Sequence, residues 1–438
     1  MMSKVFKVLF CFIIVDFFFF STRLSFSLGL NTKEWLALAG IVFFVADVYR
    51  KKLTITRELI VLFFFSVAIS LLAIFSTVYH HTQERLYNTY FMSMLTWLGG
   101  AFAVISFLKT VHKDLSIELL AAYIVAVSVA QGLIAVIADN YAPLDAFIMR
   151  TVPGMDWMKS EGRLYGFGET ATLDTGGIRF ALALILCAHN IRLLVSDKRT
   201  KFIPLYVLAF LIITVTGNMV ARTTSVGAVI GLVYLLIFIS PFKLQLNLST
   251  LIAWLWILLE ALTVVIIVIA LYNSDEKFKD RTRFAFEGFF SLAEEGHWRT
   301  GSNDRLKSMY VFPDNLETWI IGDGYFVNPA GDLNYLGEIT PGYYKDTDVG
   351  YLRFIFFFGL IGLSVYSLFI IYAGCVCARM HPGNTLLFIL LTSMNFVVWL
   401  KVATDCFFIL CLFICLGYIM NSIKETEEKQ NELTESEI

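Results

Sequence analysis

Long apolar runs separated by short polar stretches follow one another along the chain. A membrane-spanning helix needs roughly 20 predominantly apolar residues to cross about 30 Å of hydrocarbon. By this criterion the sequence predicts an all-α integral membrane protein with about twelve transmembrane helices. The predicted spans lie near residues 5–20, 34–49, 58–79, 90–108, 116–138, 172–194, 202–217, 220–240, 248–272, 348–377, 384–400 and 402–421.

The composition agrees with this pattern. Hydrophobic residues make up 58% of the 438 residues and charged residues 16%, whereas about a quarter of the residues in a soluble domain are charged. The mean hydropathy is +0.71. Because the net charge is only -2, no basic surface indicates a nucleic-acid partner. The turn "IGDGYF" (321–326) lies outside any strand–helix context, so it does not indicate a dinucleotide cofactor, and we expect no cofactor.

Lysine and arginine positions predict the orientation of the spans. With the N-terminus inside, short inner segments hold sixteen of these residues and short outer segments hold eight. The positive-inside rule therefore places both termini in the cytoplasm. Residues 1–421 then form a polytopic membrane domain, and the outer loops 139–171 and 273–347 form a packed extracytoplasmic cap, since both are rich in aromatic residues and glycine. Residues 422–438 lack apolar periodicity and are predicted to be a disordered cytoplasmic tail.

Arginines occur at one level of the predicted membrane domain. Arg179, Arg222 and Arg353 lie in the outer halves of three spans, and Arg163 lies in the adjacent outer loop. Any one of them alone is explained by a side chain that extends to the membrane interface. Together they favour an anion, because the planar guanidinium binds phosphate oxygens through two parallel hydrogen bonds. The pattern predicts a site for a lipid-linked phosphate or diphosphate at the outer leaflet.

Carboxylates accompany the arginines. Asp346 and Asp348 lie at the outer mouth of the span near 348–377. A carboxylate there can act as a general base on a sugar hydroxyl. Capping of the helix N-terminus is the structural alternative for either residue. Two carboxylates alone are weak grounds for a divalent cation, so no metal site is predicted. Glu260, near the middle of its span, is expected to pair with an arginine.

Aromatic side chains in the two outer loops are candidates for contacts with sugar rings. The alternative is that they belong to the aromatic belt at the membrane interface. The residues concerned are Trp157, Tyr165, Trp298, Trp319 and Tyr325.

Four stretches occur together in a characteristic order. They are "GRLYGFGE" with Arg163 and Gly166, "TGNMVARTTSVG" around Arg222, the segment with Arg305 ahead of "IIGDGYF", and "DTDVGYLRFIFFFGLIG" after the second large loop. In this order the sequence resembles the O-antigen polymerase and O-antigen ligase superfamily of bacterial membrane glycosyltransferases. The resemblance covers roughly residues 160 to 365.

The resemblance implies a glycosyltransferase C-like fold in the bacterial inner membrane and a glycan carried on undecaprenyl diphosphate as the substrate. It also implies metal-independent, inverting catalysis, in which Arg222, Arg163 and, as a further candidate, Arg305 bind the diphosphate and stabilise the leaving group. Arg353 and Arg179 join them as candidates because of their depth in the predicted spans. Ligases of this family typically have a histidine where this sequence has Asp348. This difference favours a polymerase and leaves the base open between Asp348 and Asp346.

The leading hypothesis is an O-antigen polymerase that transfers glycan from undecaprenyl diphosphate to a lipid-linked repeat unit, with a chain-length regulator as a partner. One alternative is a ligase that transfers the finished glycan to lipid A core or to a protein. A second alternative is a flippase or another transporter of lipid-linked oligosaccharide. Transport predicts charge in both membrane halves, whereas the three arginines of the predicted spans all lie in the outer half.

Overall fold

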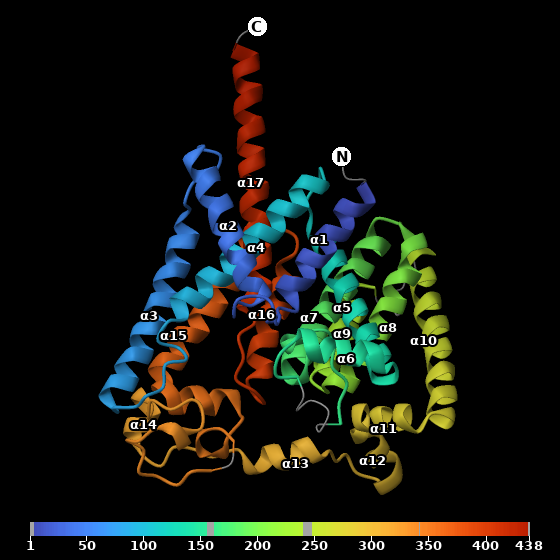
Figure 1. Cartoon of the computed structure of the whole chain (residues 1–438). Coiled ribbons are helices and arrows are strands. Elements are labelled where there is room, and N and C mark those ends of the chain that lie inside the picture. Colours follow the sequence, from blue (N-terminus) through green and yellow to red (C-terminus); the bar gives the residue numbers. More distant parts are fainter. Residues whose placement is uncertain (1–3, 156–161, 240–247, 341, 437–438) are drawn as a thin grey trace. The chain divides into compact units, whose positions relative to one another are not determined.

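The computed structural model describes residues 4–155, 162–239, 248–340 and 342–436 (Figure 1). Within these ranges the chain consists of helices and their connections, with one isolated β-bridge between Arg23 and Asn31. Each predicted span falls on a helix, which confirms the prediction of an all-helical chain. These helices are α1 Lys4–Phe19, α2 Thr32–Tyr49, α3 Arg57–Tyr79, α4 Tyr90–Val111, α5 Ile117–Asn140, α7 Leu173–Ser196, α8 Ile203–Val220, α9 Thr224–Phe238, α10 Leu248–Ser274, α15 Gly350–Met380, α16 Thr385–Val398 and α17 Phe407–Ser436.

Seven helices in the described ranges are long and apolar enough to cross a membrane. They are α3, α4, α5, α7, α8 together with the short helix η3 Thr200–Phe202 that precedes it, α10 and α15. The apolar helices α9 and α16 and the apolar part of α17 are shorter. Lengths of this kind are those that a hydrocarbon layer requires, so the fold is compatible with a membrane protein.

The two long loops contain helices of their own. Residues 139–171 include α6 Ala142–Thr151 and η2 Glu169–Ala171. Residues 273–347 include α11 Glu276–Ala285, α12 Glu287–Glu295, α13 Gly301–Ser308, α14 Leu316–Ile321, η4 Pro329–Gly331 and η5 Tyr344–Asp346.

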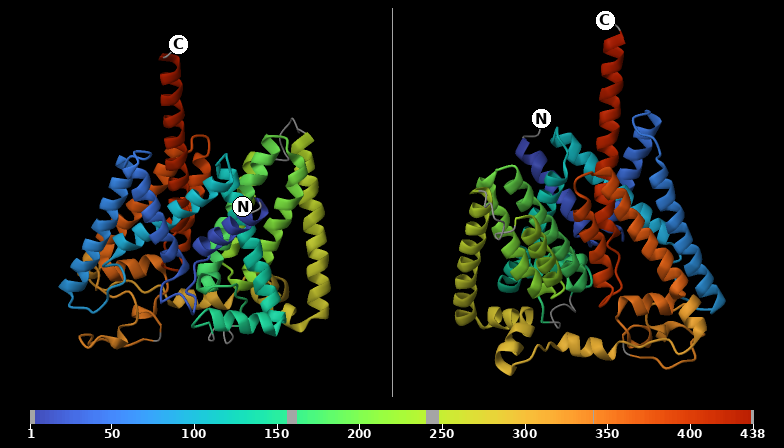
Figure 2. Two further views of the ribbon diagram at one scale, coloured as in Figure 1. Left: turned by 45° about the horizontal axis from the view of Figure 1, so that its top comes forward. Right: turned by 180° about the vertical axis from the view of Figure 1, so that it is seen from behind.

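The helices gather into two compact units. Unit 1 comprises residues 1–36 and 107–299, and unit 2 comprises residues 37–106 and 300–438. The boundary after Arg299 therefore divides the second long loop, so that α11 and α12 belong to unit 1 and α13 and α14 to unit 2. In each unit the helices of the long loops lie at one end, as Figures 1 and 2 show.

Helix α7 is the central helix of unit 1, since 89% of its apolar segment is buried. Small residues allow α9 to approach it closely. A Cβ at Gly227 of α9 would overlap the backbone of Ala181, and a Cβ at Gly177 of α7 would lie 2.8 Å from the side chain of Ala221. Close backbone approach through small residues is a common way to pack apolar helices. This packing fixes the position of the α8–α9 turn relative to α7.

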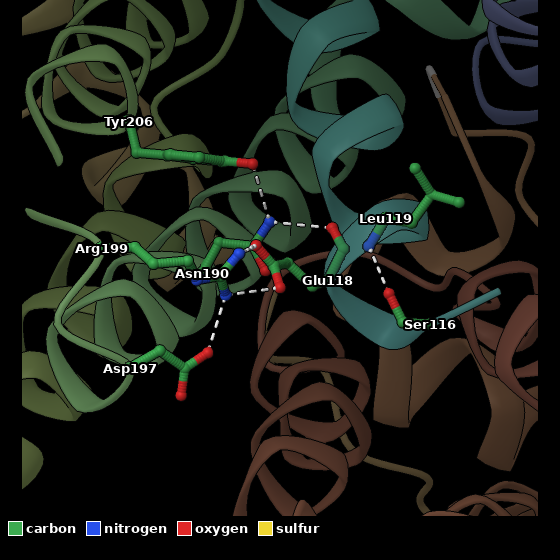
Figure 3. A network of polar contacts seen from close by, with 7 residues as sticks. All are labelled: Ser116, Glu118, Leu119, Asn190, Asp197, Arg199 and Tyr206. Atoms are coloured by element: carbon green, nitrogen blue, oxygen red, sulfur yellow. Dashed lines mark hydrogen bonds and ion pairs between the residues drawn. The ribbon is translucent and has the colours of Figure 1, made fainter. Parts of the chain in front are cut away.

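A polar network joins α5, α7 and the α7–α8 connection of unit 1 (Figure 3). Arg199 donates two parallel hydrogen bonds to the carboxylate of Glu118, both 2.8 Å long, and a third of 2.8 Å to Asp197. Asn190, which is fully buried, donates to the Glu118 backbone carbonyl at 3.1 Å and to the Tyr206 hydroxyl at 3.2 Å. The network holds the ends of three helices together.

Replacing Glu118 by glutamine is expected to lower the free energy of unfolding by about 0.5–1 kcal/mol, the range for a partly exposed ion pair. The side chains of Arg199 and Glu118 are 39% and 30% exposed, so water screens the pair and a larger loss is not expected. Thermal unfolding in detergent measures the effect. Asp197→Asn serves as the control, because it removes the charge from a single contact with Arg199 at a side chain that is 52% exposed, and it should cost less; equal losses would contradict the assigned roles.

Helix α15 is the central helix of unit 2 and packs against α3, α16 and α17 (Figure 2). It is broken at Phe358 (φ −141°, ψ 21°) and Gly359 (φ 66°, ψ −173°). Next to the break, the carbonyl groups of Phe356 and Phe357 accept hydrogen bonds from the turn that follows α14. Asp323 N donates to Phe356 O at 2.6 Å, and Gly324 N donates to Phe357 O at 3.1 Å. The turn thus satisfies backbone groups that the break would leave unpaired in an apolar environment.

Helix α17 continues through the charged C-terminal segment to Ser436. The prediction of disorder from residue 422 therefore differs from the structure. The segment "KETEEKQNEL" is rich in glutamate, lysine and glutamine, which have high helix propensity. The absence of apolar periodicity indicates that the segment does not pack into a hydrophobic core, and it does not exclude a helix.

Candidate functional site

Arg222 lies in the turn between α8 and α9. The sequence predicts it inside the span 220–240, and this placement differs from the structure. Ser225 N closes the turn by donating to the Arg222 carbonyl at 3.0 Å. The Thr223 hydroxyl anchors it to α7 by donating to Asp174 at 2.6 Å. Because the residue lies at a helix end, its guanidinium reaches polar partners and does not have to be placed in hydrocarbon.

The Phe284 ring of α11 brings Arg222 and Arg163 together. The guanidinium carbon of Arg222 lies 4.6 Å from the ring centroid and that of Arg163 lies 5.0 Å from it. Both distances are within the range of an attractive cation–π interaction. Two of the arginines that the sequence proposed as diphosphate ligands therefore share one aromatic surface.

Helix α11 is held in place by charged and polar contacts at both of its ends. Asp275 caps its N-terminus by accepting from Phe278 N at 3.1 Å. Arg281 forms an ion pair of 2.9 Å with Asp139 at the end of α5, and it also donates to the Gly162 carbonyl. These bonds tie α11 to the 139–171 loop, so both long loops contribute to the same part of unit 1.

Glu287, the first residue of α12, forms an ion pair with Arg222. The Arg222 side chain is 19% exposed and that of Glu287 is 39% exposed. The carboxylate is thus the more accessible partner, and an anionic ligand that approaches Arg222 would compete with it. We call Arg163, Arg222, Phe284 and Glu287 the arginine cluster.

Arg179 has a different role from that predicted. It is 5% exposed within α7 and donates to the Phe19 carbonyl at the end of α1 and to the Thr175 carbonyl at 3.0 Å. Carbonyl groups in the last turn of a helix lack intrahelical donors. Arg179 therefore joins α7 to the C-terminus of α1.

In unit 2, Arg353 is enclosed by two aromatic rings. Its guanidinium carbon lies 3.5 Å from the centroid of Tyr343 and 3.9 Å from that of Phe326. It also donates to the Phe326 carbonyl at 3.1 Å. With a side-chain exposure of only 5%, this arginine is a fixed positive charge and not a mobile interface anchor.

Asp348 faces this fixed charge. Its Oδ1 lies 3.7 Å from Arg353 Nη1, and its side chain remains 31% exposed. The residue at the N-cap of α15 is Val349 and not Asp348. A carboxylate that is oriented by a buried arginine and open to solvent can accept a proton from a bound hydroxyl. We call Asp348, Arg353, Tyr343 and Phe326 the aspartate site.

Asp346 lies in a strained turn next to the aspartate site. Lys345 (φ 57°) and Asp346 (φ 49°) are both in the left-handed region, which residues with a Cβ seldom adopt and which costs of order 1–3 kcal/mol at such positions. Thr347, between the two aspartates, is buried and donates to the Met309 carbonyl at 2.6 Å.

Within the described ranges no three His, Cys, Asp or Glu side chains gather as a metal-ligand set.

The turn that follows α14 supports the aspartate site. Asp323 accepts hydrogen bonds from the Thr318 hydroxyl at 2.5 Å and from the Tyr344 hydroxyl at 2.9 Å. Burial and the neighbouring Asp323 carboxylate raise the pKa of Tyr344, so its hydroxyl stays protonated and donates. Tyr344 also stacks on Tyr325 with ring centroids 5.2 Å apart. We call this turn, residues 322–324, the GDG turn. These contacts connect it to the residues that precede Asp348.

Two further predicted residues, Arg305 and Glu260, lie on other helices of the two units. Arg305 is exposed on α13 of unit 2. Glu260, on α10, has one carboxylate oxygen that is buried without a hydrogen-bond partner in the described part of the chain, and no ion pair with an arginine is seen for it there. The expectation that Glu260 neutralises an arginine is therefore wrong for the described part of the chain.

No protein-family model, curated protein or solved structure matches the chain. The geometry of the two sites is therefore the basis for any assignment of function.

Sequence reasoning missed the aromatic and acidic partners of the arginines. Phe284 and Glu287 lie within a long loop, and Phe326 and Tyr343 both follow the turn at residues 322–324 in the sequence. The signal that was present is the aromatic content of both loops. Of the proposed sugar-contacting residues, Tyr165 donates to Asp145 at 2.5 Å, Trp298 packs on Phe289 and Trp319 stacks on Phe312. Trp157 lies outside the described residues.

Proposed function

We propose that this protein is a polysaccharide polymerase of the O-antigen polymerase type, a membrane glycosyltransferase that transfers glycan from undecaprenyl diphosphate to a lipid-linked repeat unit. The observation that supports it best is the convergence of Arg163 and Arg222 on Phe284. Two guanidinium groups on one aromatic surface match a diphosphate, which presents several oxygens for bidentate hydrogen bonds.

In the proposed mechanism the arginine cluster binds the diphosphate of the donor. Arg222 exchanges its ion pair with Glu287 for phosphate oxygens. As the bond between the anomeric carbon and the diphosphate oxygen breaks, the electron pair stays on the diphosphate. The guanidinium groups then stabilise the negative charge that develops there, which is the usual large contribution to catalysis with a phosphate leaving group.

We propose Asp348 as the general base because of its own surroundings in unit 2, and the variant Asp348→Asn tests whether it acts in the same transfer as the arginine cluster of unit 1. The acceptor hydroxyl oxygen attacks the anomeric carbon from the side opposite the leaving group, and its proton passes to the Asp348 carboxylate. Arg353 orients that carboxylate at 3.7 Å. The transfer forms one glycosidic bond, breaks one bond to diphosphate and inverts the anomeric configuration, and it needs no cofactor.

The proposed setting is the inner membrane of a bacterium, with both termini in the cytoplasm and residues 139–171 and 273–347 on the outer side as a cap. The lipid-linked oligosaccharide is then supplied on the outer leaflet. A regulator of chain length is the expected protein partner.

Deletion of the protein from the bacterium that makes it tests the function. A polymerase loss leaves single repeat units on the cell surface and removes the ladder of longer glycans in gel electrophoresis, and re-expression restores the ladder. A ligase loss instead leaves long chains on the undecaprenyl carrier. A transporter loss leaves lipid-linked units on the inner leaflet. An unchanged ladder contradicts all three roles.

Asp348→Asn is expected to reduce polymerisation by about 10²–10⁴-fold, the usual contribution of a general base. The amide keeps the shape of the side chain and cannot accept the proton. Asp346→Asn is the matched control from the same turn and should keep most of the activity. Polymerisation of a defined lipid-linked unit by the purified protein measures both. Retained activity in Asp348→Asn with loss in Asp346→Asn would assign the base to Asp346 instead.

A further inference from the structure

A polar cavity of about 320 Å³ lies in unit 2, where the α2–α3 connection meets the ends of α15 and α17. Figure 1 shows this connection at the end of unit 2 opposite α14, so the cavity is separate from the aspartate site. Three cations line it, Lys51, Lys52 and Arg379, against a single carboxylate, Glu58. Its volume is within the range of small-ligand sites, about 300–1,000 Å³.

The cationic loop of the cavity is fixed to α17. The Tyr418 hydroxyl donates to the Thr54 carbonyl, and the Ser422 hydroxyl donates to the Lys52 carbonyl. Lys51 adopts a left-handed conformation (φ 57°), which for a residue with a Cβ persists only where the surroundings hold it. The two lysines are therefore presented by a constrained loop, as in a built site, and not by a mobile surface segment.

The N-terminus of α3 opens into the same cavity. Thr56 is its N-cap residue, yet the side chain makes no capping hydrogen bond, and its hydroxyl oxygen is buried without a partner in the described part of the chain. Backbone N–H groups in the first turn of a helix lack intrahelical acceptors and carry a partial positive charge. The cavity thus offers hydroxyl and N–H donors beside its three cations.

An apolar groove of about 400 Å³ adjoins this cavity. Tyr418 lines both, and the stretch that supplies Thr54 and Thr56 to the cavity supplies Ile55 and Leu59 to the groove. The rest of the groove is lined by aliphatic and aromatic side chains of α2, α3, α4 and α17. A basic cavity that continues into an apolar groove matches a molecule with an anionic head and a hydrocarbon tail.

We propose that the two cavities together bind one anionic phospholipid. Its phosphate lies among Lys51, Lys52 and Arg379, and one acyl chain lies in the groove beyond Tyr418. Basic pockets between membrane helices are suited to anionic headgroups, with about 1 kcal/mol per cation near the membrane surface. The apolar groove favours a lipid over free phosphate as the ligand, because an acyl chain fills the groove and inorganic phosphate does not. None of these residues belongs to the arginine cluster or the aspartate site, so the inference does not depend on the proposed function.

Native mass spectrometry of the purified full-length protein in detergent tests the proposal. Phosphatidylglycerol, phosphatidylcholine and inorganic phosphate are titrated separately. We expect phosphatidylglycerol to bind most tightly. Lys52→Gln with Arg379→Gln should weaken it by about 25-fold, or roughly fivefold for each cation removed. The control, Arg50→Gln with Lys109→Gln, removes two exposed cations of the same predicted membrane face that do not line the cavity, and it should change the affinity by less than twofold.

Chain length tests the groove. Phosphatidylglycerol with short acyl chains should bind more weakly than the long-chain lipid, and Leu95→Trp, which narrows the groove, should reduce only the affinity for the long-chain lipid. Equal affinity for phosphatidylcholine, or no loss in the Lys52/Arg379 variant, overturns the site. Binding of inorganic phosphate as tight as that of the lipid overturns the role of the groove. Circular dichroism of each variant confirms that it is folded.

Discussion

Arg222→Ala is expected to reduce glycan polymerisation by about 10²–10³-fold, the loss that follows removal of one group that stabilises developing negative charge. In the bacterium this leaves single repeat units and no ladder. The reason is that Arg222 lies over Phe284 at 4.6 Å together with Arg163, so its removal halves the positive charge of the cluster. Arg222→Lys should retain part of the activity, because it keeps the charge and loses the bidentate geometry.

Two further variants separate binding from structure. Glu287→Gln removes the ion-pair partner of Arg222 and should leave the ladder intact if the carboxylate only competes with the ligand. Arg150→Ala removes an exposed arginine of α6 in the first long loop and serves as the matched control. Undecaprenyl diphosphate should raise the melting temperature of the unmodified protein, but not that of Arg222→Ala. A normal ladder from Arg222→Ala at normal protein levels contradicts the proposed function.

The helices could be predicted from the sequence because hydropathy is averaged over long segments. Each predicted span falls on a helix, usually within a few residues of its ends. The same averaging hides short interruptions. The α8–α9 turn around Arg222 lies between two apolar segments, and the hydrophobic pattern placed Arg222 inside a span. Polar residues of a turn that is only a few residues long have little weight in such an average.

The arginine cluster could be predicted only in part. Arg163 and Arg222 stand out in the sequence because a cation is unexpected at those positions. Phe284 and Glu287 do not stand out, because aromatic and acidic residues are common in a polar loop. Their contribution arises from tertiary contacts, since the ion pair between Arg281 and Asp139 brings α11 to the end of α5. A pairing between residues so far apart in the sequence leaves no local pattern.

The break in α15 is the feature of unit 2 that the sequence concealed most completely. Phe358 and Gly359 lie inside an uninterrupted apolar run, "FIFFFGLIG", and a glycine within such a run is not by itself a sign of a break. What requires the glycine is its conformation: with φ 66° and ψ −173°, Gly359 occupies a region that is essentially restricted to glycine. Its position against α14 adds a second requirement, because a Cβ there would overlap the Ile320 carbonyl.

Gly359→Ala is therefore expected to lower the free energy of unfolding by roughly 2–6 kcal/mol, from backbone strain of about 1–3 kcal/mol and overpacking of about 1–3 kcal/mol. The overlap is with backbone atoms, so no side-chain rotation relieves it. Separation of α14 from α15 would also weaken the hydrogen bonds from Asp323 N and Gly324 N to the α15 carbonyls. Denaturation of the purified protein in detergent, together with its amount in membranes, measures the loss.

Two variants show whether the break itself is responsible. Ser76→Ala removes a hydroxyl of α3 that donates to the carbonyls of Phe357, at 2.7 Å, and Ile321, at 3.1 Å. It should cost about 1–2 kcal/mol, since the Phe357 carbonyl keeps the Gly324 N–H as a donor. Gly331→Ala adds a Cβ where no atom lies within 4 Å and should change stability by less than about 0.5 kcal/mol. If Gly359→Ala were as stable as Gly331→Ala, α15 would not depend on this break. A loss confined to Gly359→Ala and, to a smaller extent, Ser76→Ala would show that the GDG turn and the broken helix stabilise each other, and hence that the residues leading to Asp348 depend on both.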